Sequence, residues 1–238
     1  MIFRTEFVTG LDDVRLGGAV KNRTIMKMFE DAAGFHSDTI NDGVNDLDTK
    51  KNAWILMAWK VQVVRRPQYG QRLTVATWSR EMKSAHAFRD YEMTDDNGNV
   101  LVLASSKWTL ISTENRRIMK IPENIKEGYG QHDRCVFGQW TPERPELSES
   151  YDGTFVYKVL RRDTDLIGHM HNLNYLDLAC EVLPEEVYMA PEPDNIVILY
   201  RTEIKIGDTV ECRYSSENSM HKVDIVSERG THAVIKMW

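Results

Sequence analysis

Cysteine is scarce in this 238-residue sequence, which contains only Cys135, Cys180 and Cys212. The three are far apart, form no CxxC pair and give no even-numbered framework. The sequence therefore argues against a disulfide-stapled scaffold and against a structural zinc site. We expect buried thiols without disulfide partners. A GxSxG motif is also missing, and no cysteine sits in a recognisable nucleophile motif, which disfavours a serine or cysteine acyl-enzyme.

Long apolar runs are absent as well. No run approaches the roughly 18 residues that a transmembrane helix needs, and residues 1–6 lack the basic-then-apolar layout of a signal peptide. A cytoplasmic location is therefore the expectation. The formal net charge of -6 gives no support for binding nucleic acid. Three arginine pairs, each able to meet an acidic partner or to form a solvated strand rim, lie at 65–66, 116–117 and 161–162.

The first half of the chain predicts one helix followed by a series of strands. After a short strand at 3–8, apolar residues recur at helical spacing over 22–37, with Asn22 available as the N-cap. Asp95 to Gly98 predicts a hairpin turn. The β-rich runs lie at 53–64, 72–80, 87–94 and 100–112. Consecutive strands without crossover helices predict an α+β fold with an antiparallel sheet.

The pattern then restarts. A proline-containing segment at 131–150 has no clear period and is interpreted as a linker. Beyond it we expect a strand at 154–160, a helix from about 172 to 183 ended by Pro184, and strands at 196–206, 209–215, 222–227 and 232–237. The same order of elements, together with shared Asp, Leu, Gly and Asn between 13–22 and 163–172, predicts a duplication into 1–130 and 151–238.

The two halves differ at the aligned positions that could carry chemistry. The aligned pairs are Asp165 and Arg15, His169 and Ala19, and His171 and Lys21. An alignment of the strands anchored on residues 196–199 places Glu203, expected in the middle of a strand, over Gln62. The second half thus holds an ionisable set, and the first half a scaffold version.

An acid, an imidazole and amides at the entrance of a helix indicate acyl-group hydrolysis. Backbone N–H groups at a helix start can polarise a carbonyl oxygen, and a neighbouring carboxylate can activate water for direct attack or act as the nucleophile. Structural alternatives remain open: Asp165 could cap a turn, Asn172 could be the N-cap and Glu203 could face solvent. His169 and His171 at i and i+2 are weak evidence for a metal site.

The motif of the second half is similar to that of the acyl-acyl-carrier-protein thioesterases, the family of plant plastid enzymes and their bacterial relatives. The family pattern is D-x-D-x-N-x-H-V-N-N-x-x-Y, and this sequence has Asp163, Asp165, His169, Asn172 and Tyr175 at the matching places. Residues 200–204 resemble the later pattern Y-R-R-E-C. Further similarity at 52–56, 66–70 and 88–92 extends the resemblance over nearly the whole chain.

The resemblance implies a tandem hotdog fold, in which each half is a long helix wrapped by an antiparallel β-sheet. Residues 1–130 would hold a degenerate site and the acyl-chain pocket. The residues expected near the pocket, which are more safely interpreted as core, are Ile25, Met28, Phe29, Trp54 and Met57. Residues 151–238 would be catalytic. The implied activity is hydrolysis of a fatty acyl thioester on an acidic acyl carrier protein, releasing free fatty acid and ending chain elongation, without a metal or organic cofactor.

The resemblance also implies roles for individual residues. The catalytic residues would be Asp165, His169 and Glu203. The substrate-binding residues would be His171, Asn172, Asn174 and Tyr175. Either carboxylate could activate the water, while His169 would position it or protonate the leaving group. N–H groups at the helix start would hold the thioester carbonyl.

Three departures from the family pattern bear on the mechanism. Ile167 replaces the loop Asn, His171 replaces the first Asn of the pair, and Ile204 replaces a Cys once proposed as the nucleophile, so a cysteine mechanism is excluded there. An acyl-CoA thioesterase and a non-catalytic acyl-binding hotdog protein remain as alternatives. Either a monomer with an internal pseudo-dimer or a homodimer is compatible with two hotdog halves.

Overall fold

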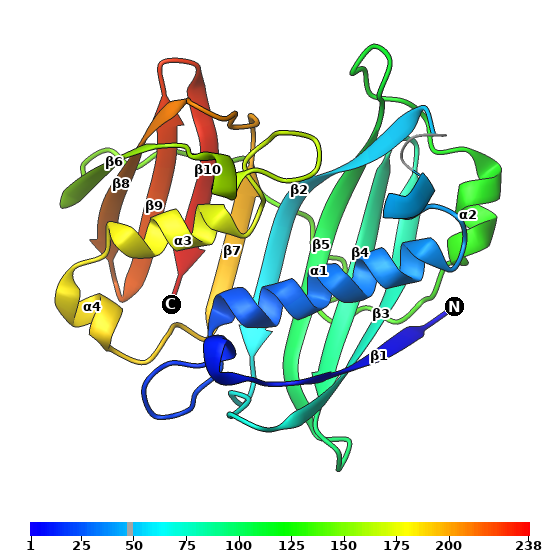
Figure 1. Cartoon of the computed structure of the whole chain (residues 1–238), viewed down its shortest axis with the longest axis horizontal. Helices are drawn as coiled ribbons and strands as arrows, with labels where there is room; N and C mark the ends of the chain where they lie inside the picture. Colours follow the sequence, from blue (N-terminus) through cyan, green and yellow to red (C-terminus); the bar gives the residue numbers. More distant parts are fainter. Residues whose placement is uncertain (47–49) are drawn as a thin grey trace. The chain divides into compact units, whose positions relative to one another are not determined.

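The computed structural model describes residues 1–46 and 50–238, and Figure 1 shows its two compact units. Unit 1 is Met1–Thr141 and unit 2 is Pro142–Trp238. The segment 131–150, expected to be a linker, contains no helix or strand. Its residues up to Thr141 pack with unit 1, where the indole Nε1 of Trp78 donates to the carbonyl of Arg134. Within the described ranges, no helix is both long and apolar enough to cross a membrane.

Unit 1 is an antiparallel five-stranded sheet with the order β1-β3-β4-β5-β2. Its strands are β1 (Phe3–Val8), β2 (Asn52–Val63), β3 (Arg72–Lys83), β4 (His86–Thr94) and β5 (Val100–Ser112). Two helices accompany them, α1 (Asn22–Asp38) and α2 (Glu123–Tyr129). The predicted hairpin turn between β4 and β5 is confirmed, because Asp95 Oδ1 accepts the N–H groups of Asn97 and Asn99.

Helix α1 runs across the face of this sheet (Figure 1) and supplies much of its core. Ile25, Met26 and Phe29 are fully buried, and the ring of Phe29 lies 5.2 Å from that of Tyr91 on β4. The helix was correctly predicted, but its N-cap was not. Lys21 holds the N-cap position and Asn22 is already helical. The Asn22 side-chain oxygen instead accepts a hydrogen bond from Arg66 at 2.8 Å.

Unit 2 repeats this arrangement with the strand order β7-β10-β9-β8-β6. Its strands are β6 (Gly153–Lys158), β7 (Asn195–Tyr200), β8 (Thr209–Glu217), β9 (Met220–Ser227) and β10 (Gly230–Met237). Its helices are α3 (Asn174–Glu181) and α4 (Glu185–Met189). Each unit therefore has a strand, a helix and four further strands with equivalent neighbours, as the predicted duplication requires.

The helix of unit 2 and the strand that follows it are shorter than predicted. The helix begins at Asn174, and Leu173 holds the N-cap position that was expected for Asn172. The strand predicted at 196–206 ends at Tyr200, so Glu203 does not lie mid-strand. The chain leaves the ladder because the segment after Tyr200 bonds elsewhere: Thr202 offers its carbonyl to the His232 ring, and Ile204 accepts the N–H of Met170 at 2.8 Å.

The cysteines are only partly as expected. None of the three, all of which the structure describes, forms a disulfide. Cys212 is buried, and burial raises the pKa of its thiol. Cys135 and Cys180 are half-buried, so the expectation of buried thiols is wrong for these two.

A histidine is buried in the core of unit 1. The His36 ring stacks on Phe3 at 5.4 Å and meets the Tyr129 ring edge-on at 5.3 Å. Its Nδ1 accepts a hydrogen bond from the Arg89 guanidinium at 2.9 Å. Burial, the Arg89 charge and the N-terminal ammonium group together lower the pKa of His36 from 6.5 to about 3. The imidazole is therefore neutral in the folded protein at neutral pH.

Acidification should destabilise unit 1 through His36. Because the pKa is lower in the folded than in the unfolded state, the unfolded chain binds an extra proton between these two values. The free energy of unfolding then falls by up to about 1.4 kcal/mol per pH unit as the pH drops below about 6.5 toward 3. The His36→Gln variant keeps an acceptor for Arg89 and should show a shallower decline in urea denaturation between about pH 7 and pH 5. Slopes equal to those of wild type and of a His132→Gln control would contradict this.

Candidate active site

Asp163 holds together the beginning of the motif. The motif opens with a 3₁₀ turn at Arg161–Asp163, and Asp163 Oδ2 accepts the N–H of Leu160 at 2.7 Å and the hydroxyl of Tyr157 at 2.8 Å. Its carbonyl accepts the N–H of His171 and the side-chain amide of Asn174. The equivalent Asp13 of unit 1 likewise accepts a backbone N–H through Oδ2. These contacts assign Asp163 to the scaffold.

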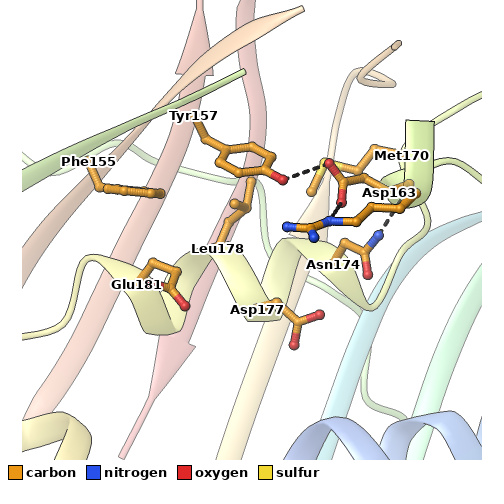
Figure 2. A pocket seen from close by; sticks show the side chains of 9 residues that line it. Phe155, Tyr157, Asp163, Met170, Asn174, Asp177, Leu178 and Glu181 are labelled. Carbon is orange, nitrogen blue, oxygen red and sulfur yellow. Dashed lines mark hydrogen bonds and ion pairs between the residues drawn. The ribbon is translucent and has the colours of Figure 1, made fainter. Parts of the chain in front are cut away.

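Figure 2 shows Asp163 in the wall of a pocket of unit 2 between β6 and α3. The pocket has a volume of about 400 Å³, and Tyr157 and Asn174 both point toward Asp163 there. Asp165, His169 and Glu203 are not among its lining residues. Of the four predicted substrate-binding residues, Asn174 alone lines this pocket, where its amide is bonded to the backbone of Asp163.

Asp165 shapes the turn that follows. Its Oδ1 accepts the N–H groups of Ile167 at 2.9 Å and of His169 at 3.1 Å, and its own N–H donates to the His169 carbonyl at 2.7 Å. One carboxylate oxygen is thus engaged by the backbone, which was the structural alternative for this residue. The turn places His169 directly after it, with Gly168 at a positive φ of 80°.

His169 and Glu203 meet at the entrance of this turn. His169 Nε2 lies 3.3 Å from Glu203 Oε2, and Lys205 Nζ lies 3.4 Å from Glu203 Oε1. The side chains of His169 and Glu203 are 12% and 31% exposed, so the pair can be reached from solvent. Since His169 also donates its backbone N–H to Asp165, the three predicted catalytic residues come together. Lys205 was missed, although its i+2 spacing from Glu203 on an extended segment was a usable signal.

Backbone hydrogen bonds fix the segment that carries Glu203. His169 and Lys205 form an antiparallel bridge, and the Met170 N–H donates to the Ile204 carbonyl. The carbonyl of Glu203 accepts from the Arg229 guanidinium at 3.3 Å. Ile204, which stands at the position of the family cysteine, is fully buried.

The same bonds show that the strand alignment of Glu203 with Gln62 is wrong. In unit 1, the Val20 N–H donates to the Pro67 carbonyl, as Met170 does to Ile204 in unit 2. Glu203 therefore corresponds to Arg66, the residue before Pro67. With this correspondence Tyr200, where β7 ends, lies over Val63, where β2 ends, so the anchor on apolar strand residues had displaced the alignment by four positions (66 against 62).

Tyr175 lies close to Glu203. It is buried, and its ring packs edge-on against Tyr200 at 5.2 Å. Burial chiefly raises the pKa of Tyr175, and the charges of Glu203 and Asp165 act in the same direction. Tyr175 is therefore a neutral phenol close to both carboxylates.

The remaining predicted site residues are bonded within their own turn or to the end of β7. His171 Nδ1 accepts the N–H of Leu173 at 3.3 Å, and the carbonyl of Asn172 accepts the Tyr200 hydroxyl at 3.1 Å. The N–H of Asn174 donates to the His171 carbonyl. Two N–H groups at the start of α3, on Leu173 and Asn174, are thus engaged within the turn and do not point at a substrate carbonyl as expected.

The expected acyl-chain residues of unit 1 divide by burial. Ile25, Met28 and Phe29 on α1 are buried, whereas Trp54 and Met57 on β2 are half-buried. The acyl-chain pocket in residues 1–130 stays a prediction.

Sequence comparison identifies the family of the chain. Residues 1–129 match the acyl-ACP thioesterase N-terminal domain, and residues 149–236 match the C-terminal domain. The chain belongs to the acyl-ACP thioesterase family. The predicted resemblance is thereby confirmed, with both family domains present in the expected order.

Solved structures confirm the tandem hotdog fold. A putative oleoyl thioesterase from Lactobacillus plantarum superposes with a TM-score of 0.89 at 19% identity, covering 100% of this chain and 95% of that one. A 12:0-ACP thioesterase from Umbellularia californica gives a TM-score of 0.87 at 17% identity, covering 99% and 96%.

The curated relatives are distant. An oleoyl-acyl carrier protein thioesterase of Coriandrum sativum is 22% identical over 90% of this chain and 63% of its own length. A palmitoyl-acyl carrier protein thioesterase of Cuphea hookeriana is 25% identical over 85% of this chain and 52% of its own length. The chain thus spans between about half and two thirds of these curated relatives.

Replacing Asp163 should reduce stability, because Asp163→Ala leaves the Leu160 N–H and the Tyr157 hydroxyl without their acceptor. We expect the free energy of unfolding to fall by about 2 kcal/mol. Urea denaturation measures this, with Glu186→Gln on the exposed surface of α4 as the control. A loss no larger than that of the control would contradict the scaffold role.

Proposed function

We propose that this chain hydrolyses the thioester of a fatty acyl-acyl-carrier protein, releasing free fatty acid and the carrier thiol and so ending chain elongation. The observation that carries the proposal is the 3.3 Å approach of His169 Nε2 to Glu203 Oε2 in the unit that matches the C-terminal family domain. Unit 1 has Ala19 and Arg66 at these positions, so at this equivalent place it lacks the base and the imidazole that are in contact in unit 2.

Glu203 is the proposed base. Its carboxylate takes a proton from a water molecule held with the help of His169, while the water oxygen attacks the thioester carbonyl carbon. The C–S bond then breaks, and the proton passes through His169 to the departing sulfur. The products are a carboxylic acid and a thiol, so atoms and electrons balance. Strong acid assistance is not needed, because a thiol has a reference pKa of about 8.5.

Asp165 is proposed to act on His169. One of its oxygens binds the backbone N–H groups of the turn, which fixes the position of the imidazole. The negative charge beside His169 then stabilises the imidazole when it carries the transferred proton. Neither task requires contact between Asp165 and the substrate.

Removing the base should abolish turnover. In Glu203→Gln the carboxylate is replaced by an isosteric amide, and we expect kcat to fall by about 10²-fold to 10⁴-fold. Release of free thiol from palmitoyl or shorter acyl-carrier protein measures it, with Glu217→Gln at the exposed end of β8 as the control. Full activity of Glu203→Gln would refute the assignment.

Asp165 can be tested separately from the shape of the turn. Asp165→Asn keeps an oxygen acceptor for Ile167 and His169 but loses the charge, so we expect turnover to be abolished while the free energy of unfolding changes by less than about 1 kcal/mol. Thiol release and urea denaturation are measured on the same preparation. Full turnover by this variant would leave Asp165 with a purely structural role.

The same assay tests whether the acyl group is taken from acyl carrier protein or from coenzyme A. Acyl-carrier protein and acyl-CoA of equal chain length present the same thioester on different carriers. Preferred turnover of the carrier substrate supports the proposal. Preferred turnover of acyl-CoA would replace it, and no release from either would indicate an acyl-binding protein.

A further inference from the structure

Three segments of unit 2 surround the Glu203–His169 pair and form one surface, here called the loop face: residues 160–168, residues 205–207 and Arg229. The Gly207 N–H donates to the carbonyl of Val159 at 3.0 Å, which joins the first two segments. Arg229 forms an ion pair with Asp208 and also donates to the Glu203 carbonyl. The segments are thus held together by the same contacts that position the candidate base.

Large apolar side chains project from the loop face. Leu166 is 79% exposed, Ile167 is 53% exposed and Ile206 is 50% exposed. Single exposed apolar residues are common on proteins, but several around one site mark an interaction surface. Their burial by a partner would remove apolar area from water next to the candidate catalytic pair.

The exposed charged side chains of the loop face are basic, although unit 2 as a whole is acidic. Unit 2 contains 18 acidic and 10 basic side chains. Four of the 10 basic side chains lie on the loop face, and all four are exposed: Arg161, Arg162, Lys205 and Arg229. Four acidic side chains lie within or against its segments: Asp163 is buried, and Asp165, Glu203 and Asp208 are half-buried. Asp163, Glu203 and Asp208 form ion pairs with Arg162, Lys205 and Arg229. The loop face thus has four basic and four less exposed acidic side chains, whereas the rest of unit 2 has 14 acidic and 6 basic ones, so an acidic partner is repelled less here than by the rest of unit 2.

The equivalent loop of unit 1 shares the exposed apolar residue of the unit 2 loop but not its basic residues. Leu16, the counterpart of Leu166, is fully exposed. An exposed leucine, here called the apolar tip, is therefore common to both loops. Leu11 and Asp12 stand where unit 2 has Arg161 and Arg162. The basic pair therefore accompanies the loop that carries the ionisable groups, and it is not a requirement of the turn.

We propose that the loop face docks an acidic carrier protein, which delivers its acyl thioester to the Glu203–His169 pair. The inference rests on the proposed function. It assigns the carrier's docking surface to the basic pair Arg161–Arg162 and to the apolar tip Leu166. The phosphates of acyl-CoA would also be attracted by the arginines. A folded partner alone would in addition cover apolar side chains spread over two separate loops.

Charge reversal at the basic pair tests the docking. In Arg161→Glu/Arg162→Glu we expect KM for acyl-carrier protein to rise about tenfold or more with kcat nearly unchanged, and the defect to shrink at high salt. Leu166→Ser should raise KM independently. An acyl-N-acetylcysteamine thioester, which lacks the carrier, should be hydrolysed equally by wild type and variants. Arg144→Glu, an exposed site of unit 2 outside the loop face, is the matched control.

The outcomes separate this proposal from the proposed function. If wild type hydrolyses none of the thioesters, the function itself fails. If wild type is active but the variants retain the wild-type KM for acyl-carrier protein, the docking surface is wrong. An equal rise of KM for acyl-CoA and acyl-carrier protein would show that the arginines bind phosphate groups. That result would refute the proposal that the loop face docks a carrier protein. Equal loss on the carrier-free thioester would show damage to the site.

Discussion

The structure of the site depends on one short piece of antiparallel backbone pairing, between His169–Met170 and Ile204–Lys205. This pairing sets the separation of His169 and Glu203, which are 34 positions apart in the sequence. It uses main-chain groups alone, so it can form whatever side chains these residues carry. Unit 1 contains the same pairing between Ala19–Val20 and Pro67–Gln68. A common scaffold therefore carries different side chains in the two units.

Those side chains give the two units opposite electrostatic character at the equivalent place. In unit 1, Arg66 donates hydrogen bonds to Asn22 and to the carbonyl of Val20, which ties the start of α1 to the segment after β2. In unit 2, Glu203 at the same position faces an imidazole. An arginine remains protonated across the physiological pH range and cannot serve as a base there, whereas a carboxylate can accept a proton. The substitution at this one position distinguishes a structural clamp from a candidate reaction centre.

Sequence patterns were sufficient where structure is determined locally. The period of α1, the Asp-Asn-Gly turn and the order of strands depend on neighbouring residues, and these predictions were confirmed. The motif likewise indicated Asp165 and His169. The register of Glu203 depends on backbone bonds between distant segments, and in unit 1 the matching bond is accepted by the carbonyl of Pro67, which no sequence pattern reveals. The bond of Asn22 to Arg66 and that of the Asn172 carbonyl to Tyr200 could not be predicted either, because each partner is far away in the chain.

The turn at Asp165 explains why a catalytic assignment and a structural one need not compete. In unit 1 the turn contains Gly17 and Gly18, both at positive φ, whereas unit 2 has Ile167 in the first place and a single positive φ at Gly168. A branched residue disfavours positive φ, yet both turns keep the same backbone bonds: the Arg15 N–H donates to the Ala19 carbonyl as that of Asp165 does to His169. In unit 2, Asp165 Oδ1 adds to these bonds by accepting the Ile167 and His169 N–H groups. The bonds that stabilise the turn thus also keep a carboxylate next to His169, so the structural role of Asp165 and its proposed action on His169 use the same geometry.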